Sequence, residues 1–193
     1  LEPVYASNLF YSNNQYAGTD EERLDGFQKL LDDPEIKAIL CARGGYGTMR
    51  IIDKLDFSKF LLHPKWIAGY SDVTVLHSHI NKNFGIETLH GSMPINFSAN
   101  TPESLESLRK ALFGEELSYA TSNHSYNRTG KTEGVLTGGN LSILYSLSGS
   151  ASDIETNGKI LFIEDLEEYL YHIDRMMVQL KRSGKLQNLA GLI

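Results

Sequence analysis

Hydrophobic residues follow two patterns that alternate along the chain, namely the spacing typical of helices and the short apolar runs typical of buried strands. A capping box between Thr19 and Glu22 opens the first predicted helix, apolar residues follow at helical spacing, and Pro34 ends it. The short apolar run 36–42 then fits a buried strand. By the same criteria we expect further strands at 66–70, 86–89, 134–136 and 160–163, and further helices at 49–55, 73–80, 101–113, 141–147 and 171–181.

Regular alternation of strands and helices predicts an α/β fold, with a parallel sheet covered by helices. A polar stretch rich in Ser, Thr and Asn interrupts the alternation at 118–130. We therefore expect an N-terminal α/β domain over 1–115, a linker over 116–130, and part of a smaller C-terminal α/β domain over 131–193. The chain starts without Met and stops on an apolar run that resembles a beginning strand, so we expect both ends to be cut.

Composition narrows the class of protein. The net charge is −6 and no basic stripe is present, which argues against nucleic-acid binding. The apolar runs are too short to span a bilayer, so no membrane partner is expected. Cys41 is the only cysteine, which excludes an internal disulfide and favours a reducing, cytoplasmic location.

Ser71 lies between a predicted strand and a predicted helix. Such a turn would expose its hydroxyl at the top of the sheet, and the backbone N–H of Asp72 would face a developing oxyanion. Gly69 permits a close approach, although the string is not Gly-x-Ser-x-Gly. The alternative, which spacing alone favours, is that Ser71 is an N-cap whose hydroxyl accepts the N–H of Thr74.

The glycine-rich segment 43–47 follows another predicted strand. Its backbone N–H groups could form an anion-binding nest, used as an oxyanion hole or for phosphate, although no Gly-Lys-Ser/Thr follows as in a P-loop. The alternative, which this motif alone favours, is a tight turn that requires positive φ.

An acidic cluster at 164–168 follows a third strand. Glu164 is its first residue and is expected to face a cleft, where a carboxylate can orient a histidine; the alternative is a solvated loop. His90, at a strand end, is the best internal candidate for a base, whereas His77 and His79 lie too far along the helix after Ser71. No histidine pair has the spacing of a zinc motif, so no metal site is expected.

Together these motifs resemble the LD-carboxypeptidase family of serine peptidases. The resemblance covers nearly the whole chain and rests on Tyr16–Arg23, Ala42–Thr48, Gly69–Thr74, His90–Met93, Gly134–Ser142, Ile160–Asp165 and Ile173–Met176. It implies a flavodoxin-like N-terminal domain whose first strand is missing before Leu1, and a smaller C-terminal domain.

The resemblance also implies the site residues. In a Ser-Glu-His triad, Ser71 matches the nucleophile and Glu164 the orienting carboxylate, while the family histidine belongs to a downstream Gly-His motif that this chain lacks. The oxyanion hole would be the backbone N–H groups of Gly45 and Asp72. Expected substrate contacts are Arg43, Gly44, His90 and Asn140, and either Arg43 or Arg175 would bind a terminal carboxylate.

The reaction implied is hydrolysis of the amide between an L-configured centre and a terminal D-amino acid in a muropeptide tetrapeptide, during peptidoglycan recycling. It needs no metal and no cofactor. Three alternatives stay open: a microcin C-type peptidyl-nucleotide hydrolase, a catalytically inactive fragment without the triad histidine, and a phosphate binder using Gly44 and Gly45. A homodimer is compatible with such folds.

Overall fold

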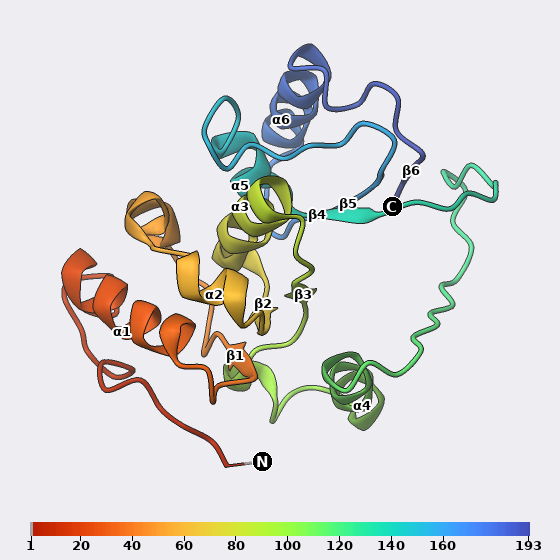
Figure 1. Ribbon diagram of the computed structural model, residues 1–193. Helices are drawn as coiled ribbons and strands as arrows, with labels where there is room; N and C mark the ends of the chain where they lie inside the picture. Colours follow the sequence, from red (N-terminus) through yellow and green to blue (C-terminus); the bar gives the residue numbers. More distant parts are fainter. Residues whose placement is uncertain (1) are drawn as a thin grey trace.

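Two small parallel sheets organise the chain in a computed structural model that describes residues 2–193 (Figure 1). The first sheet has the order β1 (Ala38–Leu40), β2 (Trp66–Gly69), β3 (Leu89–His90), and the second has the order β4 (Leu136–Asn140), β5 (Ile160–Glu164), β6 (Gly191–Leu192). All strand pairs are parallel. The expected α/β class with parallel sheets is confirmed.

Six α-helices accompany the strands in the part of the chain that the structure describes. They are α1 (Asp20–Asp32), α2 (Ser58–Leu62), α3 (Thr74–Phe84), α4 (Pro102–Leu112), α5 (Leu141–Ser146) and α6 (Leu170–Arg182), with short 3-10 turns η1 (Thr48–Arg50), η2 (Ile52–Lys54), η3 (Ser71–Val73) and η4 (Pro94–Asn96). The capping box at Thr19 opens α1, and Thr101 caps α4 as expected. None of the described helices is long and apolar enough to cross a membrane.

Three predicted elements differ in the structure. The strand expected at 86–89 is reduced to the two residues Leu89–His90, so it shares only Leu89 with the prediction. The helix expected over 49–55 is a pair of 3-10 turns, and the strand expected at 134–136 begins at Leu136 and continues through two glycines. Gly138 and Gly139 have φ of 139° and 141°, and a Cβ on Gly138 would lie 1.8 Å from the carbonyl oxygen of Phe162. Glycine therefore lets β4 approach β5 closely, without the apolar alternation that marks most strands.

The two halves of the chain share a hydrophobic core. Buried side chains of β2 and α3, such as Ile67, Val75 and Ile80, pack in one cluster with Leu147, which follows α5. Ile143 of α5 packs against the same cluster. Figure 1 accordingly shows α3 and α5 side by side.

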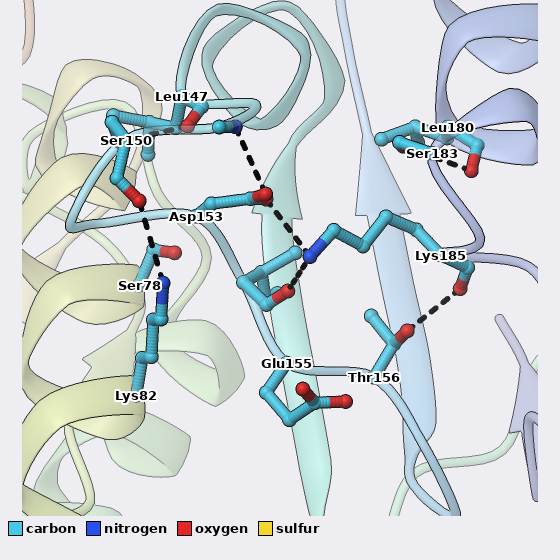
Figure 2. A network of polar contacts seen from close by, with 12 residues as sticks. Ser78, Lys82, Leu147, Ser150, Asp153, Glu155, Thr156, Leu180, Ser183 and Lys185 are labelled. Atoms are coloured by element: carbon cyan, nitrogen blue, oxygen red, sulfur yellow. Dashed lines mark hydrogen bonds and ion pairs between the residues drawn. The ribbon is translucent and has the colours of Figure 1, made fainter.

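A polar network joins the loop after α5 to both halves (Figure 2). On one side, Lys185 pairs with Asp153 at 3.1 Å. On the other, the hydroxyl of Ser78 donates to the carbonyl of Ser152 at 2.5 Å, and Lys82 donates to the carbonyl of Ser150 at 3.3 Å. Because Ser78 and Lys82 belong to α3 and Lys185 follows α6, this loop ties α3 to the segment that leads into β6.

A long exposed segment connects α4 to β4. Every residue from 113 to 136 is exposed, and 115–135 contain no helix or strand. Figure 1 shows this strap running around the edge of the molecule, from α4 to the start of the second sheet.

Candidate active site

Ser71 stands at a strained elbow between β2 and α3. Its φ is +62°, a left-handed conformation that costs a non-glycine residue roughly 1–2 kcal/mol and that clusters at functional sites. The N–H of Thr74 donates to the carbonyl oxygens of Ser71 and Asp72, not to the serine hydroxyl. Ser71 is therefore not a side-chain cap of α3, and its hydroxyl makes no hydrogen bond within residues 2–193.

The glycine-rich loop after β1 lies directly against Ser71. A Cβ on Gly44 would be 3.0 Å from the Ser71 Cβ and 3.2 Å from its Oγ, so a side chain there would press on the hydroxyl. Gly45 and Gly47 have φ of 126° and 121°, which is the tight turn expected from the motif. The loop thus brings the backbone of Gly44 against the Ser71 side chain.

Asp72 connects the elbow to this loop through its side chain. Its carboxylate is buried, and Oδ2 accepts the backbone N–H of Thr48 at 2.9 Å. Burial, together with the nearby Asp72 charge, raises the pKa of the Cys41 thiol to about 12. Sequence reasoning considered only the backbone N–H of Asp72 and missed this use of its carboxylate.

Asn140 links the second sheet to the helix that follows Ser71. Its backbone N–H donates to the Thr74 hydroxyl at 3.1 Å. Its side-chain oxygen accepts the N–H of Ile143 at 3.1 Å and so caps α5, and its amide donates to Asp165 at 3.2 Å. These bonds give Asn140 a structural role at the edge of the site, beside its expected contact with substrate.

Glu164 and His90 meet across the two sheets. Glu164 ends β5 next to Asn140 in register, and its Oε1 lies 3.9 Å from His90 Nε2. This oxygen is buried and has no hydrogen-bond partner among the described residues. Burial raises the pKa of Glu164; the Asn140 amide opposes the shift and the Asp165 charge adds to it. Burial also lowers the pKa of His90, because it disfavours the charged imidazolium.

The other histidines near the elbow are engaged in the fold. His77 Nε2 lies 2.9 Å from the carbonyl oxygen of Gly69, and burial lowers the pKa of His77 to about 4. His79 Nδ1 lies 2.8 Å from the hydroxyl of Ser152. Both imidazoles thus make hydrogen bonds with groups of the fold.

The two sides of Ser71 differ in charge. Arg43, after β1, is exposed and makes no ion pair within residues 2–193. Arg175, on α6, stacks 5.5 Å from the ring centre of Tyr171. On the β3 side, a hollow of about 330 Å³ is lined by Tyr70, His90, Gly91, Ser92, Asn96, Asn100 and Ser104.

This hollow is polar but carries no permanently charged side chain. The Tyr70 hydroxyl donates to Asn96 Oδ1 at 2.9 Å, and the Asn100 amide donates to the Ser92 hydroxyl. Nothing in the sequence pattern singled out Asn96, Asn100 or Ser104, because only the fold of the 91–104 segment brings them beside His90. In residues 2–193, no group of three or more His, Cys, Asp or Glu side chains is arranged to hold a metal ion.

Comparison with known proteins gives consistent matches along the chain. A family model described as the LD-carboxypeptidase N-terminal domain matches residues 1–91, and the LD-carboxypeptidase C-terminal domain matches residues 133–193. A probable murein peptide carboxypeptidase of Bacillus subtilis is 44% identical over 182 residues, which are 92% of this chain and 57% of that relative.

Two solved structures share the fold. Muramoyltetrapeptide carboxypeptidase from Oxalobacter formigenes superposes with a TM-score of 0.82 at 28% identity, over 97% of this chain and 64% of that one. A variant of the microcin C7 self-immunity protein MccF, in complex with adenosine monophosphate, superposes with a TM-score of 0.84 at 27% identity, over 98% of this chain and 66% of that one. The chain thus spans about three fifths of the length of the curated relatives it matches.

Proposed function

Because the chain belongs to the LD-carboxypeptidase family, we propose that it carries the nucleophile and the carboxylate of a serine peptidase that releases a terminal D-amino acid from muropeptide tetrapeptides. The observation that carries this proposal is the elbow at Ser71. Ser71 follows the central strand with a backbone φ of +62°, and its hydroxyl makes no hydrogen bond among the described residues. The backbone of Gly44 lies against its side chain.

The proposed chemistry is acyl transfer. An imidazole takes the proton of Ser71, and the serine oxygen attacks the carbonyl carbon of the scissile amide. Backbone N–H groups of Gly45 and Asp72 hold the oxyanion, the C–N bond breaks, and the amine leaves with the proton. Water then hydrolyses the acyl-enzyme and restores Ser71. Glu164 would orient the imidazole and stabilise its charged form.

The reaction needs a histidine as the general base. The family pattern places the histidine in a Gly-His pair, which the 193 residues do not contain. Within the fold, His90 is the histidine that reaches the carboxylate, at 3.9 Å from Glu164. Because Oε1 of Glu164 is buried and has no hydrogen-bond partner among the described residues, we expect it to accept a hydrogen bond from an imidazole, either that of His90 after a small shift or one from outside the 193 residues.

The order of the strands suggests how a substrate would lie. Ser71 follows the central strand, Arg43 follows β1 on one side, and the hollow at His90 follows β3 on the other. A terminal carboxylate fits the cation at Arg43, and the uncharged part of the peptide fits the hydroxyls and amides of the hollow. We also propose a cytoplasmic setting, supported by the single cysteine.

A homodimer is the oligomeric state that we propose. Its support is a group of exposed apolar side chains around the start of α6, which are Leu166, Tyr169, Leu170 and Tyr171. Sedimentation of the chain at several concentrations tests it, and a monomer at all of them would contradict it.

The deciding experiment measures D-alanine release from a muropeptide tetrapeptide. The chain is assayed alone and joined after Ile193 to the segment that follows in the Bacillus subtilis relative. We expect release by the joined form, and loss of it in Ser71→Ala. Release by the chain alone that disappears in His90→Gln would make His90 the base. No Ser71-dependent release from either form would refute the proposal.

A second candidate is hydrolysis of a peptidyl nucleotide. It is favoured by the likeness to the self-immunity protein solved with adenosine monophosphate. The same two forms are offered an aminoacyl sulfamoyl adenosine, and turnover of this compound without turnover of the tetrapeptide would select the second candidate. Binding of either compound without turnover would indicate the inactive fragment.

A further inference from the structure

One peptide group of the glycine-rich loop is held at both of its polar atoms by side chains. Arg23 Nη1 donates to the carbonyl oxygen of Gly47 at 2.9 Å. The next backbone N–H, that of Thr48, donates to Asp72 Oδ2 at 2.9 Å. The carbonyl of Gly47 and the N–H of Thr48 belong to the same planar unit, so its orientation is set from opposite sides.

Arg23 is itself held in a fixed position. Its other terminal nitrogen pairs with Asp20, its guanidinium lies 5.2 Å from the ring centre of Tyr16, and its side chain is 13% exposed. A Cβ on Gly47 would lie 2.8 Å from Arg23 Nη1 and 3.1 Å from the Tyr16 ring. A side chain at position 47 would press on both groups, and the φ of 121° at this position is strained for any residue other than glycine. The segment Tyr16–Arg23 thus contacts the loop beside Ser71, although it lies about 50 residues earlier in the sequence.

Three glycines within residues 44–47 would otherwise give this loop many conformations. We propose that Arg23 is a positioning residue, which fixes the Gly47–Thr48 peptide and thereby keeps the Gly45 backbone N–H directed at Ser71. This inference rests on the proposed function, because it assigns Arg23 to the oxyanion hole of that reaction. It also gives the Tyr16–Arg23 motif a role at the site, in addition to opening α1.

Arg50 provides a matched control for Arg23. Its side chain also pairs with Asp20, at 2.8 Å, and lies 5.4 Å from the ring centre of Tyr16. However, it reaches the Gly47 carbonyl only through its backbone N–H, at 3.0 Å, which any residue at position 50 supplies. Arg50→Met therefore removes a salt bridge to Asp20 and a contact with the Tyr16 ring, as Arg23→Met does, but it leaves the side-chain hydrogen bond to the loop in place.

The experiment measures two quantities in wild type, Arg23→Met, Arg23→Lys and Arg50→Met. The first is the hydrogen-exchange rate of the Thr48 amide by NMR, which reports the loop whether or not the chain is a peptidase. The second is the affinity for phenylboronic acid, with Ser71→Ala as the blank. The Ser71 oxygen adds to boron, its proton leaves to the buffer, and the anionic adduct occupies the oxyanion hole without needing a histidine base.

Arg23→Met is expected to bind the boronic acid roughly tenfold more weakly than Arg50→Met, which is less than the loss of a whole oxyanion donor because the N–H is displaced and not deleted. Hydrogen exchange of the Thr48 amide should be faster in Arg23→Met than in Arg50→Met. Arg23→Lys should recover part of the boronic acid affinity and part of the protection of this amide. Equal boronic acid affinity in Arg23→Met and Arg50→Met overturns the inference. If wild type binds the boronic acid no better than Ser71→Ala, the proposed function fails. Independently of that result, equal hydrogen-exchange rates of the Thr48 amide in Arg23→Met and Arg50→Met overturn the positioning role of Arg23.

Discussion

Replacing Gly138 with alanine should separate the strands that carry Asn140 and Glu164. The new Cβ would lie 1.8 Å from the carbonyl oxygen of Phe162, and 2.7 to 2.8 Å from backbone carbon and nitrogen of the same residue. These are backbone atoms of β5, so no side-chain rotation can relieve the contact. The two strands would have to move apart where Gly138 pairs with Phe162, in the middle of five paired positions.

The size of the effect follows from two contributions. An alanine at φ +139° costs about 1–3 kcal/mol in backbone strain alone. Loss of β4–β5 pairing should raise the total above about 4 kcal/mol, which is exceptional for one substitution. Gly45→Ala isolates the strain, because Gly45 has a similar φ of 126° and a Cβ there meets nothing within 4 Å.

Thermal unfolding followed by circular dichroism compares the two variants. For a chain of this size, 1 kcal/mol corresponds to roughly 2–4 °C in Tm. Gly138→Ala should therefore melt about 10 °C or more below wild type, and Gly45→Ala only a few degrees below. If the two variants melt together, the close approach of β4 and β5 is not what requires glycine at position 138.

Three further predictions concern ionisable groups. Burial raises the pKa of Glu164, so its contribution to stability is present below the ordinary carboxyl pKa and is lost as pH rises through the raised value. Glu164→Gln should therefore raise the free energy of urea unfolding near pH 7, with the gain vanishing in acid; no gain at neutral pH would contradict this. The pKa of His77 is lowered from 6.5 to about 4, so stability on the order of 3 kcal/mol should be lost as pH falls through that window. His77→Gln should flatten that part of the profile, and an unchanged slope would refute the assignment. Burial raises the pKa of Cys41 to about 12, so iodoacetamide near pH 8 should label it, by mass spectrometry, only in urea; rapid native labelling would contradict the buried thiol.

Local signals in the sequence predicted several elements well. The helices α1 and α4 begin where a Thr side chain accepts the N–H three residues later, and such a cap depends only on neighbouring residues. The strands β2 and β5 are short apolar runs within a few residues of their predicted bounds. Ser71 lies just after β2 and Glu164 is the last residue of β5, so the ends of the predicted strands were enough to place both residues at the carboxyl ends of the sheets.

Contacts between distant segments account for what the sequence did not reveal. The turn η1 starts at Thr48, whose N–H is taken by Asp72, 24 residues away. Strand β4 depends on Gly138 fitting against Phe162, which no local periodicity records. The approach of His90 to Glu164 requires both sheets to be assembled, and the Arg23 contact with Gly47 requires α1 to dock on the loop. Their catalytic roles remain predictions.

The long exposed segment between α4 and β4 also delays the completion of the core around α3 while the chain is being synthesised. The Thr74 hydroxyl accepts the N–H of Asn140, 66 residues later, and the core around α3 is completed by Leu147. At about 5–20 residues per second, α3 would leave the ribosome roughly 3–13 s before these partners. During that interval an apolar face next to Ser71 is uncovered. The apolar side chains of α3 that Leu147 covers in the finished protein therefore face water until that residue has been synthesised.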